Sequence, residues 1–250
     1  MGGRLQGRRV LVAGGTGGLG RAVAELFAAE GAQLAILSRD PNRLAEAAGA
    51  LGAAAVQADL REAASTAAAV EQAAAALGGL DGLVYAAGAH LRRPLAETTD
   101  EAWADIIAVN LTGLFHVCRA GVPHLRRADN SARTIVTIAS GAALLPPYAG
   151  ASAYAASKGG AVSFTKALAR ELAPEIRANA LLAGNTRTPL NARNMDAMSE
   201  DERARFAAAY ALRRVAEPDE IARAALFLSS EDSSYMTGAA MAVDGGRTFH

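Results

Sequence analysis

Short apolar runs alternate along the chain with longer, alanine-rich stretches of helical character. The apolar runs predict strands at Val10–Ala13, Gln33–Leu37, Ala54–Gln57, Gly82–Tyr85, Thr134–Ala139, Ala178–Leu182 and Ala240–Val243. Polar residues do not alternate through these runs, which is typical of strands buried on both faces of a parallel sheet. The stretches between them predict helices at Gly18–Glu30, Pro41–Leu51, Arg61–Leu77, Asp100–Leu125, Ala153–Leu172 and Pro218–Leu228.

This order of elements predicts an α/β fold, in which one parallel sheet carries helices on both faces. The 250 residues contain no interdomain linker, so we expect residues 1–250 to form a single domain. One segment, residues 185–210, breaks the alternation because it is polar, contains Pro189 and two methionines, and predicts no strand. A long insertion after a strand is often a mobile lid, so we expect this segment to cover a substrate.

Composition excludes several classes of function. The formal net charge is zero, which gives no electrostatic reason to expect nucleic acid or an anionic membrane as a partner. No apolar run is expected to span a bilayer, and the N-terminal residues lack the apolar core of a signal peptide. A single cysteine, Cys118, excludes an internal disulfide and suits a reducing compartment such as the cytoplasm. No metal site is expected, because metal-ligand spacing is lacking among His90, His116, His124 and His250.

A glycine-rich turn joins the first predicted strand to the first helix. It holds five glycines in the seven positions from Gly14 to Gly20. Glycine lets the main chain approach a pyrophosphate closely, and the helix start supplies N–H groups to bind it. At the first βα turn of an α/β pattern, this motif indicates a dinucleotide site rather than a merely tight turn.

The end of the second strand bears on which dinucleotide binds. NAD(H) sites usually place an acidic residue there to accept from the ribose hydroxyls, whereas this chain has Ser38 followed by Arg39. A guanidinium beside a hydroxyl suits a 2′-phosphate, and Thr16 and Arg43 are placed to add to it. Asp40 is the alternative ribose acceptor, but before Pro41 it fits better as a helix cap. The pattern therefore favours NADP(H) over NAD(H).

Tyr154 and Lys158 form the strongest candidate for chemistry. The chain has 23 arginines and only two lysines, so a lysine four residues after a tyrosine is unusual here. Positions i and i+4 share a helix face, so the phenol and the ammonium point into the same space. An isolated pair of this kind is usually a solvated helix face, so its meaning depends on its neighbours. The ammonium is expected to favour the phenolate and to lower a phenol pKa that is ordinarily about 10.

The motifs occur in a recognisable order along essentially the whole chain. They are Ala13-Gly14-(x3)-Gly18-Leu19-Gly20, Asp59-Leu60, Ala87-Gly88, Asn110, Ser140, Tyr154 with Lys158, Thr188, Tyr235-Met236-Thr237-Gly238 and Val243-Asp244-Gly245-Gly246. In this order they resemble the short-chain dehydrogenase/reductase family, close to its 3-oxoacyl-carrier-protein reductase-like branch. The resemblance implies a Rossmann-like sheet of seven strands in the order 3-2-1-4-5-6-7. It also implies a homotetramer, built on the predicted helices Asp100–Leu125 and Ala153–Leu172 and on the C-terminal segment.

The resemblance implies a catalytic tetrad of Asn110, Ser140, Tyr154 and Lys158. Tyr154 exchanges a proton with the carbonyl or alcohol oxygen, and Ser140 holds that oxygen. Lys158 tunes the phenol and binds the nicotinamide ribose, while Asn110 holds a water that connects Lys158 to solvent. Turn chemistry is the alternative for Ser140, and Asn110 is otherwise a polar interruption of a helix.

The implied cofactor contacts cover several loops. They involve Gly14, Thr16, Gly18, Leu19, Gly20, Ser38, Arg39, Asp59, Leu60, Ala87, Gly88, Asn110, Tyr154, Lys158, Thr186 and Thr188. Among them, Asp59 is expected at the adenine amino group, with Leu60 beside it. The chain departs from the family pattern at three supporting positions: Ala13 replaces a threonine, Tyr85-Ala86 replaces two asparagines, and Ala183 replaces a proline.

The predicted activity is NADP(H)-dependent reduction of a ketone or oxidation of a secondary alcohol, with a small-molecule substrate. Apolar residues suggest an apolar substrate pocket that favours bulky hydrophobic ketones over small polyols: Leu144, Leu145, Pro146, Pro147 and Tyr148 in one loop, and Leu190, Met195 and Met198 in the lid. The alternatives are an NAD-dependent dehydrogenase of a sugar, polyol or steroid, and a non-catalytic nucleotide-sensing protein. The intact tetrad argues against the sensor.

Overall fold

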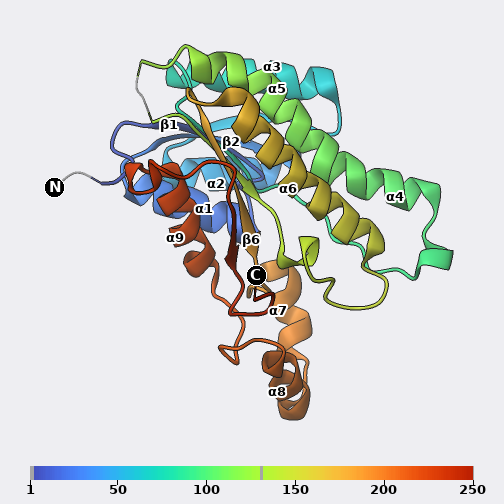
Figure 1. Ribbon diagram of the computed structural model, residues 1–250. Helices are drawn as coiled ribbons and strands as arrows, with labels where there is room; N and C mark the ends of the chain where they lie inside the picture. The colour runs from blue at the N-terminus through green and yellow to red at the C-terminus, as the bar shows by residue number, and fades with distance from the viewer. Residues whose placement is uncertain (1–2, 130–131, 250) are drawn as a thin grey trace.

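The computed structural model describes residues 3–129 and 132–249 and contains the predicted α/β architecture (Figure 1). Seven strands, all parallel to their neighbours, form one sheet in the order β3-β2-β1-β4-β5-β6-β7. The strands are β1 Arg9–Ala13, β2 Gln33–Ser38, β3 Ala54–Gln57, β4 Gly82–Tyr85, β5 Thr134–Ile138, β6 Arg177–Ala183 and β7 Ala240–Val243. The predicted strand order is confirmed, and the strand limits differ by no more than one residue.

Helices cover both faces of the sheet (Figure 1). One face carries α1 Gly18–Ala29, α2 Pro41–Leu51 and α9 Pro218–Ser229, and the other carries α3 Ala63–Leu77, α5 Gly113–Arg126 and α6 Ser152–Leu172. Strand β1 shows why the pattern has no polar positions. Leu11 packs into the core beneath α3 and α5, whereas Val10 and Val12 pack into the core beneath α1 and α9.

The helix predicted at Asp100–Leu125 is one continuous helical rod with a wide turn in it. It begins as α4 Asp100–Ile107, widens into a π-helical turn at Ala108–Thr112, and continues as α5. The rod Asp100–Arg126 is long and apolar enough to cross a membrane, which corrects the expectation that no run reaches that length. Here it packs against α3 and α6 and buries 44% of its most apolar window, so it is a core helix of this fold.

The single cysteine belongs to that rod. Cys118 lies on α5 with only 1% of its surface exposed, within the apolar cluster that also contains Leu83 and Ile135. Burial raises the pKa of its thiol to about 12.

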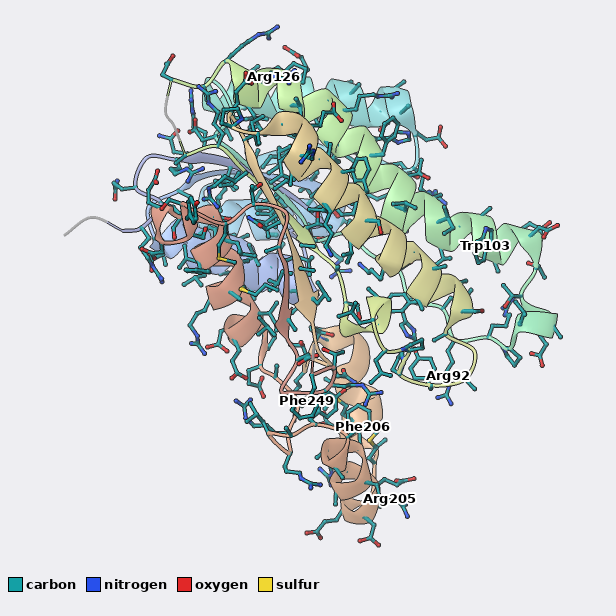
Figure 2. The ribbon with its side chains drawn as sticks, viewed as in Figure 1. Arg92, Trp103, Arg126, Arg205, Phe206 and Phe249 are labelled. Atoms are coloured by element: carbon teal, nitrogen blue, oxygen red, sulfur yellow. The ribbon has the colours of Figure 1, made fainter. Side chains whose placement is uncertain are left out.

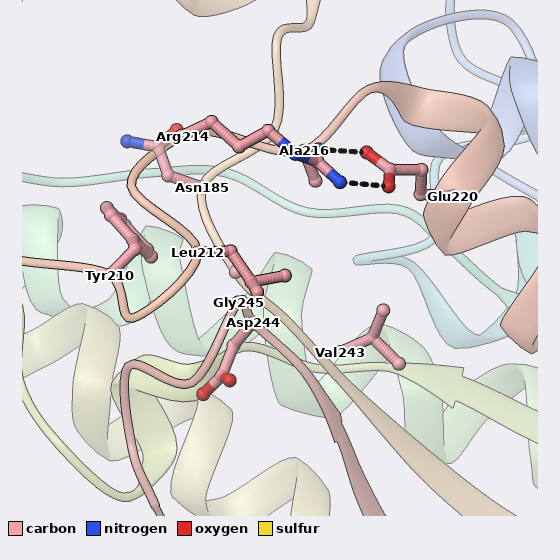
Figure 3. Close-up of a pocket in the computed structure, with 10 residues that line it drawn as sticks. Asn185, Tyr210, Leu212, Arg214, Ala216, Glu220, Val243, Asp244 and Gly245 are labelled. Atoms are coloured by element: carbon pink, nitrogen blue, oxygen red, sulfur yellow. Dashed lines mark hydrogen bonds and ion pairs between the residues drawn. The ribbon is translucent and has the colours of Figure 1, made fainter. Parts of the chain in front are cut away.

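The segment expected to be a lid contains two helices, α7 Pro189–Asp196 and α8 Glu200–Ala208, which extend beyond the sheet (Figure 1). Its two stems are joined, because the N–H of Arg187 donates to Ala216 O and the N–H of Ala216 donates to Asn185 O. A pocket of about 80 Å³ lies at this root, beside the bidentate ion pair of Arg214 with Glu220 (Figure 3).

Candidate active site

The candidate site lies at the carboxyl ends of the strands, where the strand order reverses between β1 and β4. Ligands of open α/β sheets bind in the crevice at such a switch point. At this point the glycine turn after β1 meets the loop after β4. A Cβ added at Gly14 would lie 2.5 Å from the main-chain nitrogen of Ala87, so only glycine lets the two loops meet.

The glycine turn holds the geometry that a pyrophosphate needs. Gly14 has φ +86°, in the left-handed region that favours glycine, and a Cβ at Gly20 would lie 2.2 Å from Gly14 O. Helix α1 begins at Gly18, so its first N–H groups face the turn. Thr188 lies over this point, since a Cβ at Gly18 would be 3.6 Å from its methyl group. Thr186, close by in sequence, is buried and donates to Gly184 O.

The end of β2 gathers the groups expected at a 2′-phosphate. The hydroxyls of Thr16 and Ser38 are 3.0 Å apart, and Arg43 donates to Thr16 O at 3.3 Å. Arg39 directly follows Ser38, and its side chain is exposed. Asp40 caps α2 by accepting from the N–H groups of Asn42 and Arg43, which confirms its interpretation as a helix cap.

Asp59, expected at the adenine, already has a cationic partner. Arg61 donates to both of its carboxylate oxygens, and these hydrogen bonds lower the pKa of the Asp59 carboxyl. Leu60 is buried next to it, and its carbonyl lies 3.1 Å from Nδ1 of His116. Recognition of an adenine amino group by the Asp59 side chain therefore has to share the carboxylate with Arg61.

Asn110 sits in the π-helical turn and is completely buried. Its Oδ1 accepts from the N–H of Ala89 at 2.8 Å, and its Nδ2 donates to Ala89 O at 3.0 Å and to the hydroxyl of Ser157 at 2.9 Å. The amide thus clamps the loop after β4 and ties it to helix α6. π-helical turns recur at functional sites, and here the wide turn aims a polar side chain inward.

Tyr85, one of the departures from the family pattern, supports that turn from below. Its side chain is buried, and its phenol donates to the carbonyl of Val109. A Cβ at Gly113 would lie 2.5 Å from the Tyr85 hydroxyl, so a glycine in α5 makes room for the phenol. Burial, helped by Cys118, raises the pKa of Tyr85, which stays neutral and serves as a donor.

Lys158 is buried on α6, and its ammonium donates to Ile138 O at 3.1 Å. Burial lowers the pKa of Lys158 to about 8. Gly88 lies between the lysine and the asparagine, since a Cβ there would be 3.4 Å from Lys158 Nζ and 3.5 Å from Asn110 Oδ1. Lys158 and Asn110 therefore face the same space next to Gly88, which has no side chain to fill it.

Tyr154 and Ser140 are in contact with each other through their hydroxyl groups. Burial raises the pKa of the Tyr154 phenol, and a hydrogen bond with Ser140 opposes that rise. This corrects the expectation that Lys158 lowers the phenol's pKa: burial outweighs every other influence on the phenol, and the ammonium points to Ile138 O. The Ser140 hydroxyl also accepts from the N–H of Ala142, so the turn role and the contact with Tyr154 coexist.

A polar pair that sequence reasoning missed lies against Tyr154. The His90 ring is 4.9 Å from the Tyr154 ring, and its Nε2 is hydrogen-bonded to the hydroxyl of Tyr148. The guanidinium of Arg92 lies over the Tyr148 ring at 4.8 Å (Figure 2 shows Arg92 at this end of the molecule). The pocket, which was expected to be fairly apolar, therefore has polar groups on this side.

Apolar side chains line the remaining surroundings only in part. Leu144 and Leu145 are each 45% exposed in the loop before α6, and Met195 and Met198 are half-buried in the lid. The side chain of Leu190 lies outside those that the structure describes. Within residues 3–129 and 132–249, no group of three or more His, Cys, Asp or Glu side chains is arranged to hold a metal ion.

Comparison with known proteins places the chain in a family. The family model described as enoyl-(acyl carrier protein) reductase matches residues 13–248. A probable galactose dehydrogenase from Rhizobium meliloti is 37% identical over 97% of this chain and 95% of its own length. The 3-oxoacyl-[acyl-carrier-protein] reductase of Chlamydia pneumoniae is 32% identical over 98% of each chain.

Solved structures agree. A short-chain dehydrogenase from Burkholderia cenocepacia in complex with NADP is 31% identical and superposes with a TM-score of 0.89 over 98% of this chain and 99% of its own. The fold and the site together define an oxidoreductase that acts on alcohols and ketones. The chain belongs to the short-chain dehydrogenase/reductase family.

Proposed function

We propose that this protein transfers a hydride between NADP(H) and a ketone or secondary alcohol, with Tyr154 as the general acid and base. The observation that carries the proposal is the convergence of the tetrad. Ser140 is hydrogen-bonded to Tyr154, while Lys158 and Asn110 lie on either side of Gly88. These four side chains come from the loop after β5, from α6 and from the π-helical turn, so only the folded chain brings them together.

The chain's own residues fit a nicotinamide dinucleotide. Gly14 and Gly20 leave a cradle that a Cβ would fill, and helix α1 begins directly behind it. The cofactor supplies or accepts the hydride. Tyr154 passes the proton to the substrate oxygen, which Ser140 holds in place. The ammonium of Lys158 supplies a donor for the ribose.

Preference for the phosphorylated cofactor rests on the end of β2. The guanidinium of Arg43 donates to Thr16 O beside the hydroxyl pair of Thr16 and Ser38. Arg39 directly follows Ser38 and is exposed, and Asp40 is engaged in capping. A 2′-phosphate would receive charge-assisted hydrogen bonds there. The relative from Burkholderia cenocepacia, solved with NADP, supports this choice.

We propose further that the chain works as one catalytic domain in the cytoplasm, with residues 185–210 as the substrate lid. The joined stems at Arg187 and Ala216 support a lid that moves as one piece. A homotetramer is supported by apolar side chains left exposed on the rod and at the C-terminus, namely Trp103, Phe115 and Phe249. Sedimentation velocity measures the assembly directly.

A second candidate is a dehydrogenase of sugars or polyols that uses NAD(H). The polar pair of His90 and Tyr148 against Tyr154 favours a hydroxylated substrate over a purely apolar one. The probable galactose dehydrogenase among the relatives points the same way. Initial rates with NADH and NADPH on a ketone and a sugar separate the two candidates.

The substitution Tyr154→Phe tests the proposed function. We expect kcat to fall at least about 100-fold, because general acid–base groups contribute that much, while the Kd for NADPH stays within about twofold. Tyr235→Phe, at a fully exposed phenol, is the matched control and should behave as the wild type. Near-normal turnover in the Tyr154 variant would refute the proposal.

A further inference from the structure

His90 is held in a fixed position relative to the catalytic residues. The preceding residue, Ala89, is clamped on both its N–H and its carbonyl by the buried amide of Asn110. Gly88, one residue earlier, lies against Lys158 and Asn110. The main chain at His90 is therefore held in place beside Tyr154, although the His90 side chain is exposed.

The imidazole of His90 lies between two phenols. Its ring centroid is 4.9 Å from that of Tyr154 at an interplanar angle of 56°, and 5.8 Å from that of Tyr148 at 67°. Nε2 is hydrogen-bonded to the Tyr148 hydroxyl. Arg92, over the Tyr148 ring, fixes the second phenol in turn. The loop after β4, which carries His90, and the loop after β5, which carries Tyr148, thus meet next to Tyr154.

Charge identifies the ligand that this pair suits. Partial burial and the nearby Arg92 lower the pKa of His90 from its ordinary value, which favours the neutral imidazole. A neutral imidazole has one donor and one acceptor nitrogen, and a phenol is both donor and acceptor. A hydroxyl group has the same two capacities and can exchange a hydrogen bond with each of them, donating to one and accepting from the other.

We propose that His90 and Tyr148 form a specificity site for a hydroxyl group on the carbon next to the reacting carbon. The substrate class is then α-hydroxy ketones and the corresponding vicinal diols, as in sugars and polyols. This inference rests on the proposed function, because the reacting oxygen is placed at Tyr154 and Ser140. A ketone that lacks the second hydroxyl leaves His90 and Tyr148 bonded to each other and gains nothing from them.

A matched pair of ketones tests the inference. Acetoin and 2-butanone differ by one hydroxyl on the carbon beside the carbonyl, so the ratio of their kcat/KM values isolates its recognition. With saturating NADPH or NADH, the wild type should prefer acetoin at least tenfold, which corresponds to one hydrogen bond of ordinary strength. The variant His90→Phe keeps an aromatic ring and removes both nitrogens. It should lower that ratio about tenfold, with the larger part of the change in KM for acetoin.

Two further variants separate recognition from general damage. Tyr148→Phe, which keeps the imidazole, should lower the acetoin ratio in the same direction, and Tyr235→Phe should leave it unchanged. Equal wild-type efficiency on both ketones, or equal losses on both in His90→Phe, would overturn the specificity site and leave the proposed function intact. No turnover of either ketone, or of larger pairs that differ by the same hydroxyl, would overturn both.

Discussion

The phenol oxygen of Tyr85 lies 2.5 Å from the main-chain carbonyl oxygen of Val109, the residue before Asn110. Tyr85 ends strand β4, and Val109 belongs to the π-helical turn of the long rod. The hydrogen bond therefore connects the sheet to the turn that aims Asn110 at the loop after β4. A buried tyrosine takes the place of the asparagine that the family pattern has at this point, and it supports the active site by a different route.

Removing that phenol should weaken both stability and catalysis. In Tyr85→Phe the Val109 carbonyl loses its side-chain donor in a buried setting, so the free energy of unfolding should fall by about 1–3 kcal/mol. The turn should also aim Asn110 less accurately, so kcat should fall severalfold while the Kd for NADPH changes little. Urea unfolding and steady-state kinetics measure the two effects, with Tyr235→Phe as the control. A loss of stability with kcat unchanged would limit Tyr85 to a structural role.

Two glycine substitutions should differ in effect: one should weaken cofactor binding, and the other should stabilise the fold. Gly14→Ala places a Cβ 2.5 Å from Ala87 N at φ +86°, so it should separate the two loops and weaken NADPH binding at least tenfold. Gly49→Ala lies within α2 and meets no atom within 4 Å. It should raise the free energy of unfolding by up to about 1 kcal/mol, because alanine is the better helix former. Thermal unfolding and cofactor titration measure both, and tight NADPH binding by Gly14→Ala would contradict the cradle.

The two arginines at the end of β2 should discriminate between the cofactors. Arg39→Ala should weaken NADPH binding about 10–100-fold, which corresponds to about 1.5–3 kcal/mol for a charge-assisted hydrogen bond. Arg43→Ala should act in the same direction. NADH binding should change little in either variant, since NADH lacks the phosphate. Isothermal titration with both cofactors measures this, and equal losses for NADH and NADPH would exclude a phosphate site here.

The buried ammonium should titrate within reach of experiment. Burial stabilises the neutral amine, so Lys158 should lose its proton at about pH 8 and be charged below that. Between about pH 8 and the ordinary lysine pKa of about 10.4, the folded chain then binds fewer protons than the unfolded chain at this site. Over that range the site therefore makes the free energy of unfolding rise with pH.

The composition makes this measurement simple. The chain has only two lysines, so ¹³C-lysine labelling gives two side-chain signals, and Lys166→Arg leaves the signal of Lys158 alone. Its chemical shift should follow a titration centred near pH 8. A midpoint above pH 10 would show that the amine is as well solvated as in an unfolded chain.

The sequence predicted most of the fold because strands buried on both faces of a parallel sheet are apolar at every position, and this pattern is easy to recognise. Val10, Leu11 and Val12 have to be apolar in succession, since one face of β1 packs under α1 and the other under α3. The glycine turn was predictable for a similar reason, because steric limits at Gly14 and Gly20 allow no other residue. Where the main-chain conformation or a close contact allows only one residue type, the local sequence alone predicts the structure.

The remaining features depend on contacts between distant parts of the chain. His90 has no spacing that marks it, and its partner Tyr148 comes 58 residues later, so only the fold brings the two rings together. The donor role of Tyr85 likewise depends on a wide turn 24 residues away. The contact of Ser157 with Asn110 was missed, although its position in the sequence could have indicated it. A serine directly before Lys158 and three residues after Tyr154 lies on the helix that carries both catalytic side chains.

Burial of Cys118 gives the protein an intrinsic reporter of its own opening. A thiol reacts with alkylating reagents as the thiolate. At pH 8 the Cys118 side chain is protonated, and it is enclosed between α5 and the sheet. Modification therefore requires the rod to separate from the sheet, at least transiently. With no second cysteine in the sequence, the rate of labelling measures that separation without any engineered probe. A cofactor that binds only the closed form should slow the labelling in proportion to its occupancy.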